Sequence, residues 1–411
     1  MYQAPLPEEY QELSAEETSA RIKAAKAKLE PDLVILGHHY QRSEIIEHAD
    51  FRGDSYKLCL DAGKREEAKF IVFCGVHFMA ESAAVLTNKR VILPNLAAGC
   101  SMADMANILQ VRRCWAELEQ VTDTHEIIPI TYINSAANLK AFVGERGGTV
   151  CTSTNAPKIV EWALGRGSKV LFLPDQHLGR NTAVALGFNP DVPPPLLHQK
   201  GHQTAQDIGQ VSPLNPLRMD TTPGSRGGGI PDPDMVLWDP FKPLGGNTPE
   251  AIQRAKFILW KGHCSVHARF ALEQVEKARQ ADPSVQILVH PECSLEVVNA
   301  SDLYGSTEFI IKTVEAAPAG SSWAIGTEIN LVNRLAQEYP DKRITCLDSQ
   351  ICPCSTMYRI HPSFLLWCLE SLVEGKVMNE VKVAPQIAQW AKVALDRMIE
   401  ITSGKPMAHV D

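Results

Sequence analysis

The chain contains three copies of one segment, and this repeat restricts the possible folds more than any other feature of the sequence. The first copy, from residue 32, reads DLVILGHHYQRSEIIEHADFRGDS, and the third, from residue 284, reads SVQILVHPECSLEVVNASDLYGST. When His38 is aligned with His290, the two copies need no gap. Ser55 and Thr307 then both fall 17 residues further along. Such self-similarity indicates one supersecondary unit that is used repeatedly.

The second copy, from residue 126, reads EIIPITYINSAANLKAFVGERGGTVCTSTN and is looser, because 21 residues separate Tyr132 from Ser153. In each copy a predicted strand is followed by a helix, a turn of small residues, a second helix and a further strand. Alternating strands and helices are typical of parallel sheets covered by helices on both faces. We therefore expect three pseudo-threefold-related α/β/α sandwich domains with parallel sheets.

The predicted units span residues 1–122, 123–281 and 282–411, with N-terminal helices in the first and C-terminal helices in the third. Residues 187–255, inside the second unit, interrupt the repeat. They are rich in proline and glycine, with the runs PPP and GGG, and show little apolar periodicity. This composition predicts a long loop or a partly disordered insertion at the surface, and a lid over the site is the alternative.

The composition excludes several classes of protein. The chain has 411 residues and a formal net charge of -8. General attraction to nucleic acid or anionic lipid needs clustered positive charge, which this balance does not favour. The sequence begins without a basic segment and an apolar run, and no stretch approaches the roughly 18 apolar residues of a membrane span. We expect a cytoplasmic protein with no nucleic-acid or membrane partner, whose 11 cysteines are thiols.

Polar residues recur where the strands of the three copies end, and in parallel α/β structures ligands gather at those carboxyl ends. The pairs found there are His38 with Tyr40, Tyr132 with Asn134, and His290 with Glu292. Both members of such an i, i+2 pair can point the same way from an extended segment. The three pairs are therefore predicted to contribute to one site.

Three hydroxyl residues, Ser55, Ser153 and Thr307, precede the helical runs of the three copies. A hydroxyl and the free N–H groups of a first helical turn together bind an anion. One such residue is usually an ordinary helix cap. Three in equivalent places indicate recognition of a substrate with several negative charges.

Each copy closes with a strand and a cysteine, at Cys100, Cys264 and Cys352. On a threefold axis these would converge as three thiolates. Three thiolates fit a [4Fe-4S] cluster whose fourth iron is open to substrate and acts as a Lewis acid. Structural zinc, the alternative, favours closely spaced cysteine pairs, of which Cys352 and Cys354 form only one. The other cysteines are interpreted as buried thiols, namely Cys59, Cys74, Cys114, Cys151, Cys293, Cys346 and Cys368.

The chain resembles the quinolinate synthase family through many short motifs between about residue 31 and residue 375. They are GHHYQ with GDS, NLAAGC, TYINS, CTSTNA, LPDQHLGRN, WKGHCSVH, HPEC, GST, IGTE, and CP with Met357 beyond it. The resemblance implies a triangular fold of three similar domains, with the active site and one [4Fe-4S] cluster at their common interface. It implies a transferase that condenses iminoaspartate with dihydroxyacetone phosphate to quinolinate, phosphate and water in de novo NAD biosynthesis. It also implies a functional link to an aspartate oxidase or dehydrogenase.

The resemblance assigns roles to residues of this chain. It implies Cys100, Cys264 and Cys352 as cluster ligands. The implied substrate contacts are His38, Ser55, Tyr132, Ile133 through its backbone, Asn134, Ser153, His290, Pro291, Glu292 and Thr307. Tyr40, His290 and Glu292 are hypothesised to transfer protons, since such groups serve general acid–base catalysis near neutral pH.

Several alternatives stay open at this point. The repeat spacing does not choose between Cys352 and Cys354, although the Cys-Pro start and Met357 favour Cys352. Cys354 could instead form a reversible disulfide with Cys346. The competing functions are another Fe-S hydro-lyase acting on a hydroxy acid, and a non-catalytic Fe-S redox sensor. A metal-free α/β protein with buried thiols is the simplest alternative to a cluster.

Overall fold

The computed structural model of the chain describes residues 3–61, 63–191, 233–348, 350 and 353–404. Two predictions fall outside these residues. One is the ligand Cys352, and the other is the larger part of the predicted insertion, residues 192–232.

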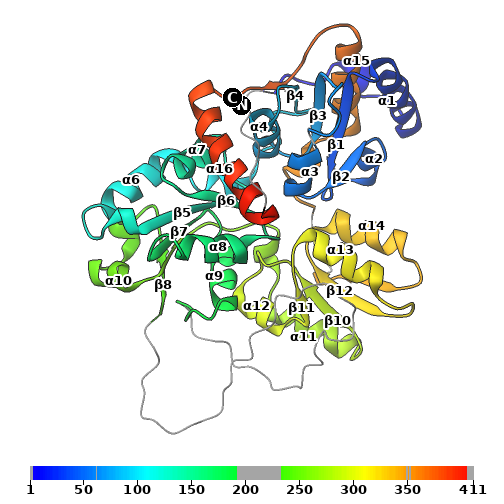
Figure 1. Cartoon of the computed structure of the whole chain (residues 1–411). Coiled ribbons are helices and arrows are strands. Elements are labelled where there is room, and N and C mark those ends of the chain that lie inside the picture. The colour runs from blue at the N-terminus through cyan, green and yellow to red at the C-terminus, as the bar shows by residue number, and fades with distance from the viewer. Residues whose placement is uncertain (1–2, 62, 192–232, 349, 351–352, 405–411) are drawn as a thin grey trace.

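The described strands form three separate sheets (Figure 1). The first contains β1 (Leu33–His38), β2 (Phe51–Gly53), β3 (Phe70–Cys74), β4 (Arg90–Ile92) and β14 (Glu380–Val381). The second contains β5 (Ile127–Tyr132), β6 (Thr149–Cys151), β7 (Lys169–Leu173), β8 (Met235–Trp238) and β9 (Phe257–Trp260). The third contains β10 (Gln286–Val289), β11 (Leu303–Tyr304), β12 (Ser322–Gly326) and β13 (Arg343–Cys346).

The three sheets share one strand order. The orders are β2-β1-β3-β4-β14, β6-β5-β7-β9-β8 and β11-β10-β12-β13, so the first strand of each copy lies between the second and the third. All of these neighbours pair in parallel except β14 with β4, which is antiparallel. The central strands β1, β5 and β7 are buried along their whole length, as expected of parallel strands covered on both faces. The predicted α/β class with parallel sheets is confirmed.

A repeated hydrogen bond supports the alignment of the first and third copies. The N–H of Ile35 in β1 donates to Asp50 Oδ2 over 2.8 Å, and the N–H of Ile287 in β10 donates to Asp302 Oδ2 over 2.7 Å. In both copies the aspartate lies just before the second strand and reaches back to the first. The sequence match between Asp50 and Asp302 therefore corresponds to one structural role.

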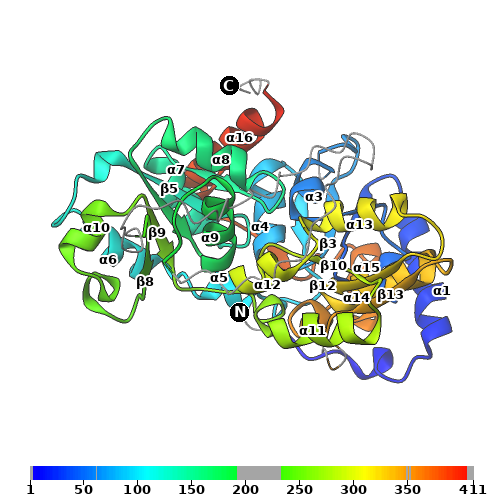
Figure 2. The ribbon, with the colours of Figure 1, turned by 90° about the horizontal axis from the view of Figure 1, so that it is seen from below.

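The helices cover the faces of these sheets (Figures 1 and 2). The α-helices of the first half are α1 (Ala15–Leu29), α2 (Ser43–Ile46), α3 (Ser55–Asp61), α4 (His77–Leu86), α5 (Ser101–Asp104), α6 (Ile108–Leu118), α7 (Ala137–Glu145), α8 (Ala156–Leu164) and α9 (Gln176–Ala185). Those of the second half are α10 (Pro249–Arg254), α11 (Leu272–Ala281), α12 (Leu295–Ala300), α13 (Thr307–Ala316), α14 (Ile329–Glu338), α15 (Pro362–Val373) and α16 (Pro385–Ser403). Short 3-10 helices are η1 (Glu8–Tyr10), η2 (Thr124–Glu126), η4 (Pro243–Gly246), η5 (His267–Arg269) and η6 (Met357–Arg359).

The C-terminal helices do not lie on the third sheet, with which the sequence grouped them. Helix α15 packs against α1 and shares the core of the first sheet, and β14 extends that sheet. Helix α16 packs against α7 of the second sheet, where Thr149 Oγ1 donates to the Ala394 carbonyl over 3.0 Å. The contact is so close that a Cβ at Gly144 would collide with the Trp390 carbonyl oxygen. The apolar faces of both helices are therefore buried against the first and second sheets rather than against the third.

The end of the predicted insertion is also more ordered than the sequence suggested. Residues 235–238 form β8, which pairs in parallel with β9, and residues 249–254 form α10. Thr248 Oγ1 accepts a hydrogen bond from the N–H of Ala251 over 3.2 Å and so caps this helix. The apolar run of β8 thus completes the second sheet.

Among the described helices, none combines the length and the apolar character needed to cross a membrane.

Candidate active site

The polar residues predicted at the strand ends do lie there. His38 is the last residue of β1, Tyr132 is the last residue of β5, and His290 directly follows β10. These three side chains and that of Glu292 are at least nine-tenths buried. The strand ends of all three sheets therefore carry polar groups that are buried inside the protein.

Glu292 is the centre of a buried hydrogen-bond network. The Tyr132 hydroxyl donates to Glu292 Oε1 over 2.7 Å, and His267 Nδ1 lies 2.8 Å from Glu292 Oε2. Burial would raise the pKa of the Glu292 carboxyl, but His267, His290 and the two hydrogen bonds lower it to about 2. The carboxyl is therefore ionised near neutral pH and can only accept hydrogen bonds.

The network continues from His267 to the first sheet. Thr327 Oγ1 lies 3.2 Å from His267 Nε2 and 3.0 Å from the hydroxyl of Tyr40. The Tyr40 hydroxyl also lies 3.2 Å from Thr307 Oγ1. Burial and the Glu292 charge raise the pKa of Tyr40, so that its phenol stays protonated. An unbroken chain of hydrogen bonds thus connects groups from all three sheets.

The two repeated histidines have the same local geometry. His38 Nδ1 accepts from the N–H of Tyr40 over 3.1 Å, and His290 Nδ1 accepts from the N–H of Glu292 over 3.3 Å. Burial lowers the pKa of both imidazoles, that of His290 to about 3. Since Nδ1 accepts, each neutral ring carries its proton on Nε2. The His290 ring also stacks on that of His267, with centroids 4.5 Å apart.

The three predicted hydroxyls do not cap the helices that they precede or begin. Ser55 and Thr307 are the first residues of α3 and α13, and the caps are Asp54 Oδ1 and Ser306 Oγ, which accept from the third residue of each helix. Ser153 lies three residues before α8. The neighbouring aspartate and serine satisfy the capping positions. The hydroxyls of Ser55, Ser153 and Thr307 are therefore not used to cap helices.

The other predicted contact residues lie near these groups. Ile133 is buried, and its N–H and carbonyl already bond to the Cys151 carbonyl and the Ser135 N–H, both over 2.8 Å. Asn134 Oδ1 is buried and has no partner among the described residues. Pro291 and Ser153 line a pocket of about 230 Å³ between the second and third sheets. Of these residues, Asn134 offers the one buried polar atom that is left for a ligand to satisfy.

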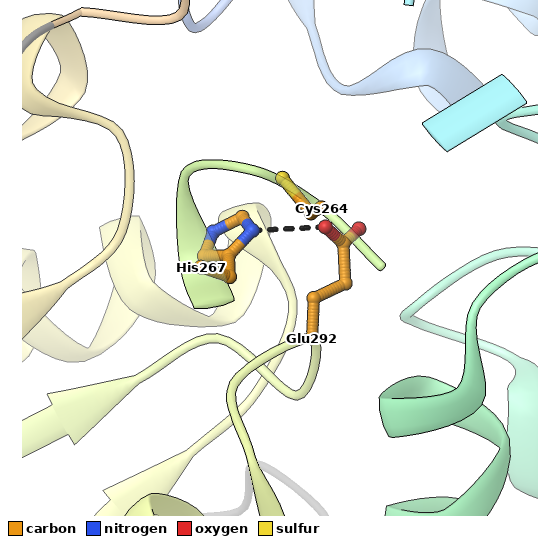
Figure 3. A group of neighbouring side chains, drawn as sticks. All are labelled: Cys264, His267 and Glu292. Atoms are coloured by element: carbon orange, nitrogen blue, oxygen red, sulfur yellow. Dashed lines mark hydrogen bonds and ion pairs between the residues drawn. The ribbon is translucent and has the colours of Figure 1, made fainter. Parts of the chain in front are cut away.

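Two of the predicted cysteine ligands approach each other beside Glu292. Burial raises the pKa of the Cys100 thiol to about 12, and charges on Cys354 and Glu292 add to this effect. Burial, Glu292 and then Cys100 raise the pKa of the Cys264 thiol. Figure 3 shows Cys264 beside His267 and Glu292, whose ligand atoms all lie within 4.8 Å of one another. Thiol, imidazole and carboxylate therefore form a group that could hold a metal ion.

Comparison with known proteins decides the family of this chain. A model of the quinolinate synthetase A protein family matches residues 20–209 and 229–400. The chain belongs to the quinolinate synthetase A family. It is similar to the quinolinate synthase of Corynebacterium glutamicum, with 51% identity over 98% of this chain and 93% of the relative. It is 50% identical to the quinolinate synthase of Nocardioides sp. over 93% of this chain, and 50% identical to that of Herpetosiphon aurantiacus over 96%.

Membership of the quinolinate synthetase A family confirms the resemblance read from the motifs. Two members of the network, His267 and Thr327, were not among the site residues predicted from the sequence. Both lie inside the quoted motifs, as the last residue of WKGHCSVH and the third of IGTE. Neither stands at a position that the repeat singles out, so the motif alone could have indicated them.

The surroundings of Cys100 and Cys264 fit the [4Fe-4S] cluster that the family resemblance implies. The backbone N–H groups of Ala103 and Met102 favour the thiolate form of Cys100, and those of His267 and Val266 favour that of Cys264. Iron–sulfur clusters are held by cysteine thiolates, and hydrogen bonds to the sulfurs help to set their reduction potential. In the described part of the chain, Cys354 is a further thiol close enough to Cys100 to influence its pKa. Thiols with such raised pKa values become thiolates by coordinating a metal.

Proposed function

We propose that this chain is a quinolinate synthase, a transferase that condenses iminoaspartate with dihydroxyacetone phosphate to quinolinate, phosphate and water. The observation that carries this proposal is the buried network around Glu292, which lies beside Cys100 and Cys264 where the three sheets meet. Family membership and full-length similarity to quinolinate synthases support it. We further propose that the reaction takes place in the cytoplasm as a step of NAD biosynthesis. An aspartate oxidase or dehydrogenase would then supply the iminoaspartate.

The proposed cofactor is one [4Fe-4S] cluster. Cys100 and Cys264 are two of its proposed ligands, and the third comes from Cys352 or Cys354. The sequence favours Cys352, whereas the charge coupling to Cys100 supports Cys354. When bound, such a cluster supplies an open iron that polarises a substrate oxygen as a Lewis acid.

Neutral donors would bind the anionic groups of the two substrates. The proposed binding residues are His38, Ser55, Tyr132, Ile133, Asn134, Ser153, His290, Pro291, Glu292 and Thr307. The Nε2–H groups of His38 and His290 and the hydroxyls of Ser55 and Ser153 can donate to carboxylate or phosphate oxygens. Because both imidazoles are held neutral by burial, recognition of the charges would rest on hydrogen bonds rather than on ion pairs.

The proposed proton transfers rest on the chain of hydrogen bonds between Glu292 and Tyr40. Glu292 is ionised, so His267 Nδ1–H donates to it, and the other ring nitrogen, Nε2, lies 3.2 Å from Thr327 Oγ1. Thr327 Oγ1 is also within hydrogen-bond distance of the Tyr40 hydroxyl. Tyr40, which stays protonated, and Glu292, which stays ionised, lie at the two ends of this chain of hydrogen bonds, and each is proposed to exchange a proton with the substrate at its own end. His290, stacked on His267, is the third group proposed to take part.

The test uses protein purified without oxygen. Iron and sulfide content and the visible spectrum would be measured first. Quinolinate would then be assayed with dihydroxyacetone phosphate and freshly generated iminoaspartate. About four irons per chain together with quinolinate formation are expected. Both should be lost in Cys264→Ala and retained in the control Cys114→Ala, which changes a buried cysteine of the core around the second sheet.

Other outcomes would redirect the proposal. A cluster without quinolinate would move the function to another Fe-S hydro-lyase or to a redox sensor. Dehydration of a hydroxy acid without phosphate release would favour the hydro-lyase. Absence of iron from the anaerobic protein would overturn the proposed cofactor.

A further inference from the structure

We propose that Asn181 of α9 is a positioning residue that holds Glu292 in place from the neighbouring sheet. This inference rests on the proposed function, since it assigns Asn181 to the carboxylate expected to act as the base. Asn181 belongs to the quoted motif LPDQHLGRN, but neither the repeat nor the resemblance gave it a role.

Asn181 makes two hydrogen bonds to the segment that carries Glu292. Its Nδ2 donates to the Pro291 carbonyl over 2.8 Å and to the Cys293 carbonyl over 2.9 Å. These carbonyls belong to the residues immediately before and after Glu292. The amide therefore fixes the backbone on both sides of the carboxylate. Only 3% of Asn181 is exposed, so water does not compete for these bonds.

The segment has no equivalent support from its own sheet. Within the third copy, the N–H of His290 donates to the Gly326 carbonyl over 3.1 Å, and that of Cys293 donates to the His290 carbonyl over 3.0 Å. In the part of the chain that the structure describes, no donor other than Asn181 reaches the carbonyls of Pro291 and Cys293. Two buried carbonyls would lose their partner if this amide were removed.

The helix that carries Asn181 is itself firmly held. Asp175 Oδ1 caps α9 by accepting from the N–H groups of its second and third residues over 2.7 and 3.1 Å. A Cβ at Gly179 would lie 2.8 Å from Cδ1 of Phe172, so the helix approaches its own sheet closely. Helices α9 and α12 lie side by side in both views (Figures 1 and 2) and pack against each other. A fixed element of the second sheet thus supports a loop of the third.

The amide is not engaged elsewhere. Its Oδ1 is buried and has no partner among the described residues, and Asn181 lines the pocket shared with Ser153 and Pro291. The two bonds to the Glu292 segment are therefore the contacts that orient this side chain. Supporting residues of this kind commonly change activity about 10- to 100-fold when they are removed, because a small displacement disturbs the reacting groups.

The experiment compares Asn181→Ala with the matched control Asn247→Ala. Asn247 Nδ2 also donates to two carbonyls, those of Leu237 over 2.9 Å and Leu244 over 3.1 Å, beside β8 and away from Glu292. Both proteins would be prepared without oxygen, and kcat and KM would be expressed per iron-loaded chain. For Asn181→Ala we expect kcat to fall about 10- to 100-fold with a much smaller change in KM. For Asn247→Ala we expect kcat within about twofold of the unchanged protein.

A second readout does not depend on activity. Hydrogen exchange should quicken at the amides of Glu292 and Cys293 in Asn181→Ala, whereas Asn247→Ala should affect residues 237–247 instead. Iron content should stay unchanged in both. A merely structural role would lower the melting temperature of both variants without separating their kcat values. If Asn181→Ala does not fold, Asn181→Gln, which keeps the amide but displaces it, should show the same loss of kcat.

The outcomes separate this inference from the proposed function. If the unchanged protein makes no quinolinate, the proposed function fails, while the exchange result still reports on the positioning of Glu292. If that protein is active and Asn181→Ala matches Asn247→Ala in both kcat and exchange, the inference is overturned. A selective loss in both readouts supports it.

Discussion

The hydroxyl of Tyr132 lies 2.7 Å from the Glu292 carboxylate, although 160 residues separate the two in the chain. Tyr132 ends β5 of the second sheet, and Glu292 follows β10 of the third. The equivalent ends of two parallel sheets therefore meet in one buried pair. A hydrogen bond to an ionised group in such a place is stronger than one between neutral groups.

Replacing Tyr132 by phenylalanine tests this pair. Tyr132→Phe keeps the ring but removes the donor, so one carboxylate oxygen loses its described partner. Hydrogen bonds to charged groups are worth about 1.5–3 kcal/mol, which predicts a fall in kcat/KM of about 10- to 100-fold. Steady-state quinolinate formation by the iron-loaded variant measures it.

The control is a second tyrosine–carboxylate bond far from the site. The Tyr10 hydroxyl donates to Glu370 Oε2 over 3.0 Å, between η1 and α15. Tyr10→Phe should leave kcat/KM within about twofold. An equal fall of kcat/KM in Tyr10→Phe and Tyr132→Phe would contradict a specific role for Tyr132.

A buried histidine predicts a pH dependence of stability. Burial is the main cause that lowers the pKa of His177 to about 4, from the ordinary value of about 6.5 for histidine. The unfolded chain therefore binds a proton at higher pH than the folded chain, and stability is lost as pH falls through this interval. Between pH 7 and pH 5 the free energy of unfolding falls by about 2 kcal/mol through this group. Replacing His177 by glutamine should remove this part of the pH dependence of the free energy of unfolding.

The measurement is anaerobic urea unfolding of the unchanged protein and of His177→Gln at pH 5, 6 and 7. The change in stability with pH is compared, rather than stability at one pH, because the substitution also alters packing. If the free energy of unfolding changes equally with pH in the two proteins, His177 is not the group that causes the loss of stability.

The repeat predicted the sheets and the strand-end residues well, because both depend on local spacing. His38 and His290 occupy the same position since one strand, one turn and one backbone N–H recur in each copy. The sequence placed Ser55 and Thr307 just before their helices, whereas Asp54 and Ser306 occupy the cap positions in the structure. Ser55 and Thr307 instead begin their helices.

Long-range packing explains what the sequence could not predict. The apolar faces of α15 and α16 do not reveal which sheet will cover them, and each docks on a different one. Thr327 and His267 join the network only because β12 and η5 come together in space. Neither residue has a repeated counterpart that could have drawn attention to it.

The third cluster ligand can be decided with two substitutions in one short segment. A charge on Cys354 raises the pKa of Cys100, which is the one observation in favour of Cys354, while Cys352 lies outside the described residues. We expect Cys354→Ala to lose most of its iron and Cys352→Ala to retain about four irons per chain. Iron and sulfide analysis of anaerobic protein measures this. The reverse result would assign the ligand to Cys352, as the sequence favoured.

Thr327 provides the most direct test of the chain of hydrogen bonds between Glu292 and Tyr40, because its hydroxyl is the link between His267 and Tyr40. Thr327→Val keeps the shape but removes two hydrogen bonds, each worth about 1 kcal/mol, so kcat should fall about 10-fold or more. Thr327→Ser restores the hydroxyl and should keep kcat within about threefold. Thr345→Val is the control, since it removes a single bond to the Trp323 carbonyl on the same sheet. If serine rescues no better than valine, the hydroxyl is not the connection and a role for the chain from Tyr40 to Glu292 must be abandoned.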